Sequence, residues 1–170
     1  AVDANLLINS DLDFKRTYSG GVKSENLNLG KLLGDSKFGH VQFNVDLEGF
    51  NYNDKYPESY IKGIVSSFDY SGYRYENISL DGIYKDGGFN GHLALDDENG
   101  KVRIDGSFNI AEKISDFNLY ATIQNLRLDK LNLSDKYIDS DISFNLNADF
   151  TGSSIDDVNG RILLDSLVLN

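Results

Sequence analysis

The chain has 170 residues, with 27 acidic against 16 basic side chains and a formal net charge of −11. Nucleic acids and anionic lipid surfaces are recognised through clustered Lys and Arg, so this charge argues against a nucleic-acid partner and against electrostatic docking on anionic lipid. The absence of Cys excludes disulfides and thiolate metal sites, while 40% hydrophobic residues suffice for a single domain with a folded core.

The sequence begins at Ala1, contains no Met and keeps a strand-like pattern up to Asn170, which indicates a section of a longer polypeptide. No apolar run approaches the roughly 20 residues of a membrane-spanning helix, and no stretch has the order of a signal peptide. Any membrane anchor is therefore expected outside residues 1–170.

Apolar residues recur at every second position in short runs that are separated by turn-forming residues. This alternation predicts about nine to eleven strands in an all-β, elongated, strongly curved and mostly antiparallel sheet. In chain order the alternating positions are Leu6 and Ile8; Val41, Phe43 and Val45; Ile64, Phe68 and Tyr70; Ile78 and Leu80; Phe89, Leu93 and Leu95; Val102, Ile104 and Phe108; Phe117, Leu119 and Ile123; Ile142, Phe144, Leu146 and Phe150; Ile162 and Leu164.

Two dipeptides predict tight hairpin turns. Asp86-Gly87 and Asn99-Gly100 favour the positive φ angles that such turns need. The strands on either side of each dipeptide are therefore expected to be antiparallel neighbours.

Two similar segments, 26–37 and 125–136, interrupt the alternation, and each predicts a strand end followed by about one helical turn. Their spacing indicates a degenerate repeat of about 100 residues, with one copy at 26–124 and a partial copy at 125–170. Repeats of this kind favour an elongated object that grows by adding units. We expect residues 1–170 to form a single β-segment.

Four glycines, Gly82, Gly91, Gly106 and Gly160, share the apolar register, whereas Gly63 falls in the opposite register when Ile64 is counted with Phe68. Glycine weakens a strand, so its recurrence on one face needs a reason. One interpretation is bulges or register marks. The other is that missing side chains on the concave side permit tight curvature, or leave room for another molecule.

Catalytic signatures are absent from the sequence. His40 and His92 lie in the polar register, without an H-E-x-x-H pair, and no G-x-S-x-G elbow or phosphate-binding glycine loop occurs. We expect no catalytic residue, no metal site, no cofactor and no enzymatic activity. Tyr70, Tyr73 and Tyr75 cluster, for which strand propensity and sugar stacking are alternative explanations.

The stretch 63–110 resembles the repeated middle of TamB-like proteins of the AsmA-like group, especially of the Bacteroidetes type. The matching positions are Tyr73, Tyr75, Asn77, Ile78, Leu80, Asp81 and Gly82, then Gly88, Phe89 and Gly91, then Gly106 and Phe108. The stretches 126–133 and 144–164 are also similar to the family's recurrent element.

This resemblance implies a taco-shaped β-groove that belongs to a periplasmic, inner-membrane-anchored parent protein. It further implies a role in moving phospholipid between the inner and outer membranes, or in supporting translocation and assembly of outer-membrane proteins. The implied partners are phospholipid acyl chains or apolar β-strand cargo, and an outer-membrane barrel that meets other parts of the parent chain.

The shared register predicts which residues line such a groove. Gly82, Gly91, Gly106 and Gly160 are the expected curvature glycines, whose missing side chains would let the sheet bend. The expected lining is Val41, Phe43, Val45, Ile78, Leu80, Phe89, Leu93, Leu95, Val102, Ile104, Phe108, Phe117, Leu119, Ile123, Ile142, Phe144, Leu146, Phe150, Ile162 and Leu164.

Two other classes fit the same alternation. An outer-membrane barrel also has ten-residue alternating strands, with its apolar register facing lipid. A carbohydrate-binding or adhesin-type β-sandwich of a cell-surface protein places its function in Tyr- and Asp-rich loops. Both alternatives stay open at the level of sequence.

Overall fold

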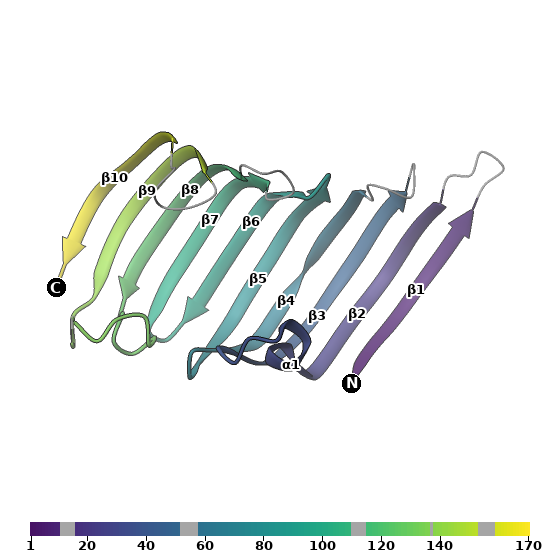
Figure 1. The fold of residues 1–170 in the computed structure, drawn as a ribbon, viewed down its shortest axis with the longest axis horizontal. Helices are drawn as coiled ribbons and strands as arrows, with labels where there is room; N and C mark the ends of the chain where they lie inside the picture. Colours follow the sequence, from purple (N-terminus) through teal and green to yellow (C-terminus); the bar gives the residue numbers. More distant parts are fainter. Residues whose placement is uncertain (11–15, 52–57, 110–114, 137, 153–158) are drawn as a thin grey trace.

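Ten strands follow one another along the chain and pair in that same order in one sheet (Figure 1). The computed structural model describes residues 1–10, 16–51, 58–109, 115–136, 138–152 and 159–170. The elements are β1 (Val2–Ser10), β2 (Arg16–Asn28), α1 (Leu29–Leu33), β3 (Phe38–Asn51), β4 (Glu58–Tyr70), β5 (Tyr73–Lys85), β6 (Gly88–Asp97), β7 (Gly100–Asn109), β8 (Ser115–Leu126), β9 (Ile142–Gly152) and β10 (Asn159–Leu169).

Each strand pairs with the next in the antiparallel sense, and β1 and β10 are the two edges of an open sheet. Such a meander needs only short connections, because each hairpin returns the chain beside the strand that it has just left. The expected fold class, an all-β curved antiparallel sheet with about nine to eleven strands, is confirmed.

Short turns connect strands at both ends of the sheet. Asp86 and Gly87 join β5 to β6 with φ angles of 51° and 78°, as their sequence predicts, and Ser71 and Gly72 join β4 to β5 with 51° and 80°. The prediction for Asn99-Gly100 is wrong by one position, because Gly100 already pairs with Asp97 and the turn consists of residues 98 and 99.

The predicted register of β4 is wrong in its middle. Val45 pairs with Gly63 and Phe43 with Val65, so Gly63 lies on the apolar face and Ile64 on the opposite one. The pairing then shifts between Gln42 and Phe43, and Ser66 is the extra residue that returns Phe68 to the apolar face. A bulge adds one residue to one strand, and two-residue counting cannot anticipate it.

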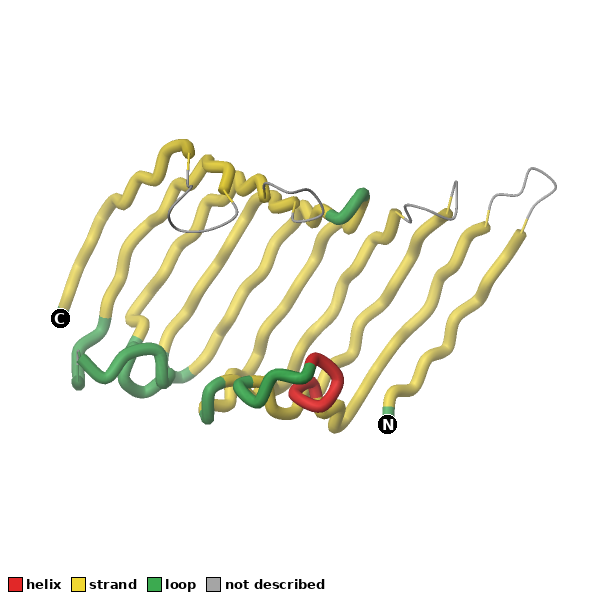
Figure 2. Tube along the Cα trace, viewed as in Figure 1, coloured by secondary structure: helices red, strands yellow, loops and turns green. Residues whose placement is uncertain are grey.

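The two segments that interrupt the alternation lie at the same end of the sheet (Figure 2). In the first, Asn28 caps α1 by accepting a hydrogen bond from the Lys31 amide at 2.7 Å, and Gly34 ends it with φ of 71°. In the second, the Leu131 amide donates to the Arg127 carbonyl at 3.0 Å, but no helix forms there. The full strand β2 escaped prediction because its inward positions include Gly20 and Ser24.

Three predicted curvature glycines, Gly82, Gly91 and Gly106, are direct neighbours across β5, β6 and β7. A Cβ on Gly82 would lie 2.9 Å from the Gly91 Cα, and a Cβ on Gly91 would lie 2.5 Å from the Gly82 Cα. The strands thus approach too closely for side chains at this level. Gly106 also has φ of 146°, which favours glycine over any other residue.

We predict that Gly91→Ala lowers the free energy of unfolding by about 1–3 kcal/mol, because the added methyl meets backbone that cannot rotate away. Gly21→Ala is the matched control, since its Cβ would meet only Asp46 Oδ1 at 3.6 Å and the Val45 carbonyl at 3.9 Å. The control should change stability by less than about 1 kcal/mol. Urea unfolding followed by circular dichroism measures both, and equal effects would contradict the close-approach explanation.

Candidate functional site: an apolar groove

The inward faces of the ten strands align into rows that cross the sheet perpendicular to the strands. One row is apolar in every strand: Ala4, Val22, Val45, Gly63, Leu80, Leu93, Ile104, Ala121, Leu146 and Leu164. A second row lies two residues away along each strand, and we call it the glycine-rich row. Its members are Leu6, Gly20, Leu47, Ile61, Gly82, Gly91, Gly106, Leu119, Ala148 and Ile162. Side chains of like character therefore form stripes along the length of the sheet.

An aromatic row flanks the glycine-rich row on its other side. Its members are Ile8, Tyr18, Gly49, Ser59, Tyr84, Phe89, Phe108, Phe117, Phe150 and Gly160. The Phe117 and Phe150 rings stack with centroids 4.8 Å apart, and the Phe89 and Phe108 rings stack at 5.8 Å. The Phe89 ring also leans over Gly82, where its Cζ would be 2.5 Å from an added Cβ. Room left by one glycine is thus taken by a neighbouring ring.

All twenty residues that the sequence proposes as groove lining lie on this one face. Eighteen are members of the rows already described or of a fourth row: Val2, Ser24, Phe43, Val65, Ile78, Leu95, Val102, Ile123 and Phe144. Val41 and Ile142 lie on the same face, beyond local shifts in the pairing register. Val41 pairs with Phe68, and Ile142 pairs with Leu126. The four proposed curvature glycines share this face, and the role of all these residues in lipid conduction stays a prediction.

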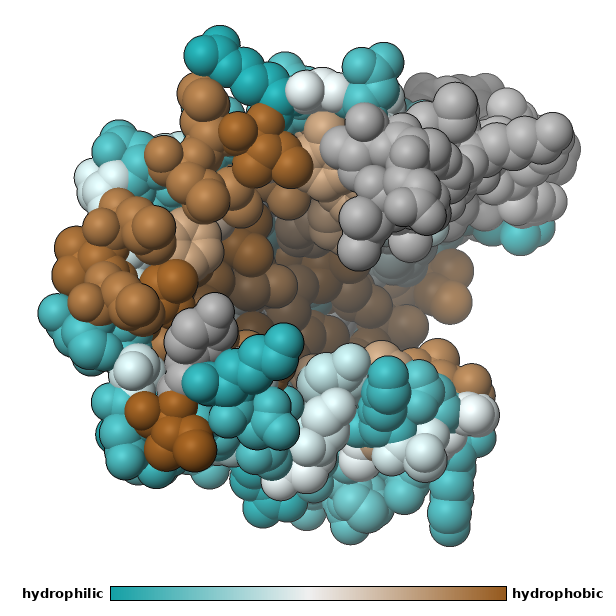
Figure 3. All heavy atoms as spheres, turned by 60° about the vertical axis from the view of Figure 1, so that its left-hand side comes forward, coloured by the Kyte–Doolittle hydropathy of each residue, from teal (hydrophilic) through white to brown (hydrophobic). Residues whose placement is uncertain are grey.

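The apolar face is hollow and open. Seen from the β10 side, the molecule has a concave interior of hydrophobic atoms, and hydrophilic atoms lie along its lower edge in this view (Figure 3). Large inward side chains keep much of their surface accessible: Tyr84 is 39% exposed, Leu93 38% and Phe108 37%. No second sheet among the described strands covers them. We call this concave face the groove.

Several inward residues were missing from the predicted lining. Ile61 and Val65 were missed because of the Ser66 bulge, although the alternation Ile61-Lys62-Gly63 pointed to them. Tyr18 was missed because β2 was not predicted as a strand, and Tyr84 was left out of the lining although it shares the register of Leu80 and Gly82. Tyr18 lies across Gly49, and its hydroxyl forms a hydrogen bond with the Ser59 hydroxyl.

A buried carboxylate organises the rim of the groove where β5 begins. Asp97 is 6% exposed and accepts hydrogen bonds from the Tyr73 hydroxyl at 2.5 Å, the Asn99 amide at 2.9 Å and the Glu76 amide at 3.1 Å. Burial of the ring and its bond to Asp97, partly offset by Asn99 Nδ2, raise the pKa of Tyr73 to about 12. Three donors on one carboxylate tie two adjacent hairpins together.

The segment 125–136, which we call the rim segment, folds inward over the same end of the groove. Its Leu131 is 0% exposed, although it lies outside the sheet. The Tyr75 hydroxyl donates to the Leu131 carbonyl at 3.0 Å, Asn132 Nδ2 to the Ser71 carbonyl at 3.3 Å, and the Arg127 amide to the Asn99 carbonyl at 2.9 Å. The rim segment is therefore fastened to the β4–β5 and β6–β7 turns.

The opposite face of the sheet carries alternating charges. Lys62 pairs with Asp81 at 3.1 Å, and His92 pairs with Asp105. Tyr60 donates to Asp81 at 2.6 Å, and this bond, together with Lys62, lowers the pKa of Asp81. Exposed pairs of this kind contribute little to stability, so their main effect is to keep the convex face solvated.

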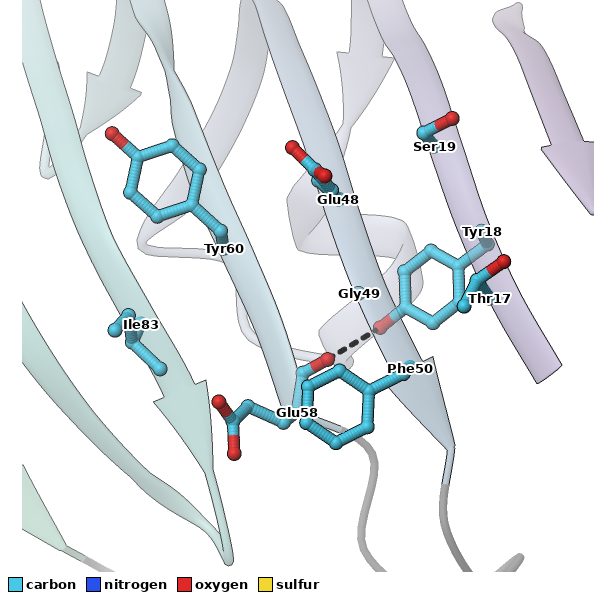
Figure 4. A pocket seen from close by; sticks show the side chains of 9 residues that line it. All are labelled: Thr17, Tyr18, Ser19, Glu48, Gly49, Phe50, Glu58, Tyr60 and Ile83. Atoms are coloured by element: carbon cyan, nitrogen blue, oxygen red, sulfur yellow. Dashed lines mark hydrogen bonds between the residues drawn. The ribbon is translucent and has the colours of Figure 1, made fainter. Parts of the chain in front are cut away.

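A second depression, of about 400 Å³, lies on β2 to β5 at the end of the sheet opposite the rim segment (Figure 4). Its lining is more polar than that of the groove. Glu48 and Glu58 contribute carboxylates, and the Tyr18 hydroxyl donates to the Glu58 carbonyl at 3.5 Å. Across the described residues, no group of three or more His, Asp or Glu could hold a metal ion. No helix in the described part of the chain is long and apolar enough to cross a membrane.

Comparisons with known proteins found no match to a protein-family model, to a curated protein or to a solved structure.

We predict that the Tyr73–Asp97 bond stabilises the fold only while Tyr73 is protonated. The folded-state pKa lies above the usual value of 10, so the stabilisation is full below pH 10 and is lost as the pH rises through about 12. Tyr73→Phe should cost about 1–3 kcal/mol at pH 8. The difference in Tm between the parent chain and this variant should then shrink between pH 10 and 12.

Tyr120→Phe is the control, because Tyr120 is exposed on the convex face. Its Tm should follow that of the parent chain across the same pH range. A Tm difference for Tyr73→Phe that persists unchanged above pH 12 would contradict the assignment.

Proposed function

We propose that this chain is a section of an envelope-spanning periplasmic protein of the TamB-like kind, and that its groove conducts phospholipid acyl chains between the inner and outer membranes. The observation that carries the proposal is the open apolar face, on which side chains such as Leu93 and Phe108 keep more than a third of their surface accessible. A large uncovered apolar surface marks an interaction site for something apolar.

The groove addresses a definite energetic barrier. Moving a 16-carbon acyl chain into water costs about 13 kcal/mol, at roughly 0.8 kcal/mol per methylene. Stripes that are apolar from β1 to β10 supply a continuous surface on which that cost is not incurred. Tight binding is not required, because a surface that matches the membrane interior keeps each step along the groove nearly level in free energy.

The polar rim fits the same purpose. Charged headgroups need water or polar partners, and hydrophilic atoms border the groove along its lower edge in Figure 3. Acyl chains inside the groove and headgroups along its rim together describe a lipid held side-on. Support for outer-membrane protein assembly is the second activity that the family resemblance implies, with an apolar strand in place of the acyl chain.

A carbohydrate-binding or adhesin-type sandwich is less well supported. A sandwich buries the apolar face of one sheet against a second sheet. All ten described strands belong to one sheet, and its apolar face has no such cover.

We predict that Leu93→Glu abolishes lipid capture without unfolding the chain. A carboxylate in the groove would need desolvation whenever an acyl chain passes, whereas in the lipid-free chain it stays in contact with water, because Leu93 is 38% exposed. Ile64→Glu is the matched control, since Ile64 is 56% exposed on the convex face.

Native mass spectrometry after incubation with phospholipid vesicles measures the capture. The parent chain and Ile64→Glu should carry lipid, and Leu93→Glu should carry at least tenfold less. Lipid-free parent chain, or equal loading of the two variants, would overturn the groove function.

A further inference from the structure

We propose that the space between the rim segment and the groove wall is a pocket for a single acyl chain. This inference rests on the proposed function and adds to it a discrete site within the groove. The site is a cavity of about 340 Å³ between strands β4 to β7 on one side and the rim segment on the other. Ile78, Leu95 and Val102 belong to its wall, and Leu126, Leu131 and Leu133 line it from the rim segment.

The lining decides the class of occupant. Every lining residue is aliphatic or aromatic, and the hydroxyl of one of its tyrosines, Tyr75, is already engaged by the Leu131 carbonyl. A water molecule held in a cavity needs two to four polar partners, and the only polar side-chain groups among the lining residues are the hydroxyls of Tyr70 and Tyr75. A polar headgroup would likewise lose its hydration without compensation. An aliphatic chain has no hydrogen bonds with water to give up when it enters the cavity.

The volume decides how many chains fit. A water molecule occupies about 30 Å³ in the liquid, and a methylene group is of similar size, so the cavity holds a chain segment of about ten carbons. Both chains of a diacyl lipid therefore do not enter together. One chain lies beneath the rim segment while the other lies in the open groove.

The rim segment is fastened over one side of this space, which stays open to solvent on the other. Leu131 is 0% exposed and its carbonyl is held by Tyr75, while Asn132 is held by the Ser71 carbonyl. Leu133, at 50% exposure, borders both the cavity and solvent. The entrance for a chain is therefore expected beside Leu133.

Chain length is the first test. Saturated fatty acids of 8 to 16 carbons, below their micellar concentrations, compete with a fluorescent fatty acid for the parent chain. Each methylene should tighten binding about fourfold until about ten to twelve carbons are bound, after which the gain should fall clearly. An undiminished gain up to 16 carbons would indicate binding along the open groove alone and would overturn the pocket.

A filled cavity is the second test. Val102→Phe places a ring in the cavity, and Ile64→Phe places the same ring on the convex face, where Ile64 is 56% exposed. Val102→Phe should weaken binding of the 12-carbon acid at least tenfold, and Ile64→Phe less than threefold. Equal weakening, or none in Val102→Phe, would overturn the pocket.

Location is the third test, and it does not depend on how Val102→Phe folds. The chain has no Trp, so Leu133→Trp and Leu32→Trp each give a single fluorescent reporter, the first at the cavity and the second on exposed α1 at the same rim. A fatty acid brominated in mid-chain should quench the indole fluorescence of Leu133→Trp at least threefold more strongly than that of Leu32→Trp. Equal quenching would overturn the pocket.

The third test is repeated with phosphatidylcholine vesicles that carry brominated acyl chains, because a phospholipid tail offers the same aliphatic chain as a free fatty acid. Selective quenching by these vesicles as well as by the fatty acid assigns the pocket to phospholipid tails, whereas quenching by the fatty acid alone assigns it to free fatty acids. Failure of the pocket is distinguishable from failure of the groove: a parent chain that captures lipid but shows no selectivity among these variants loses only the pocket.

Discussion

Cross-strand register is the constraint on which the rest of this structure depends. Side chains alternate between the two faces of a strand, so a slip of one residue would turn an entire apolar set outward. Here nine successive pairings hold the same register at the level of Leu80, Leu93 and Ile104, from Ala4 in β1 to Leu164 in β10. Two-residue turns such as Asp86-Gly87 leave little freedom for slippage. The stripes of the groove exist only because every hairpin keeps this alignment.

Close approach at the glycine-rich row gives the sheet its second constraint. Gly82, Gly91 and Gly106 lie side by side where added Cβ atoms would meet neighbouring backbone. The aromatic row lies directly beside these glycines, and its Phe89 ring covers Gly82. Close backbone approach describes Gly91, and at Gly82 a neighbouring ring also takes the space of the missing side chain. The two effects reinforce each other in one narrow band of the concave face.

Alternation in the sequence was sufficient to place all twenty proposed lining residues on one face, because period two is imposed by the strand itself. It failed at Ile64 and Gly63, where the Ser66 bulge resets the count. It also could not anticipate the burial of Leu131, whose partner Tyr75 is 56 residues away in sequence. The similarity of segments 26–37 and 125–136 indicated a repeat, but not that the second segment would fold over the groove.

An uncovered apolar face is costly in water, and the rest of the molecule shows how that cost is limited. The convex face carries ion pairs such as Lys62–Asp81, and the net charge of −11 opposes association between copies. At one rim, the three hydrogen bonds to Asp97 and the bond from Tyr75 to the Leu131 carbonyl hold the hairpins and the rim segment together. Polar groups thus fix this end of the groove, and the apolar rows beyond it stay uncovered by any described strand.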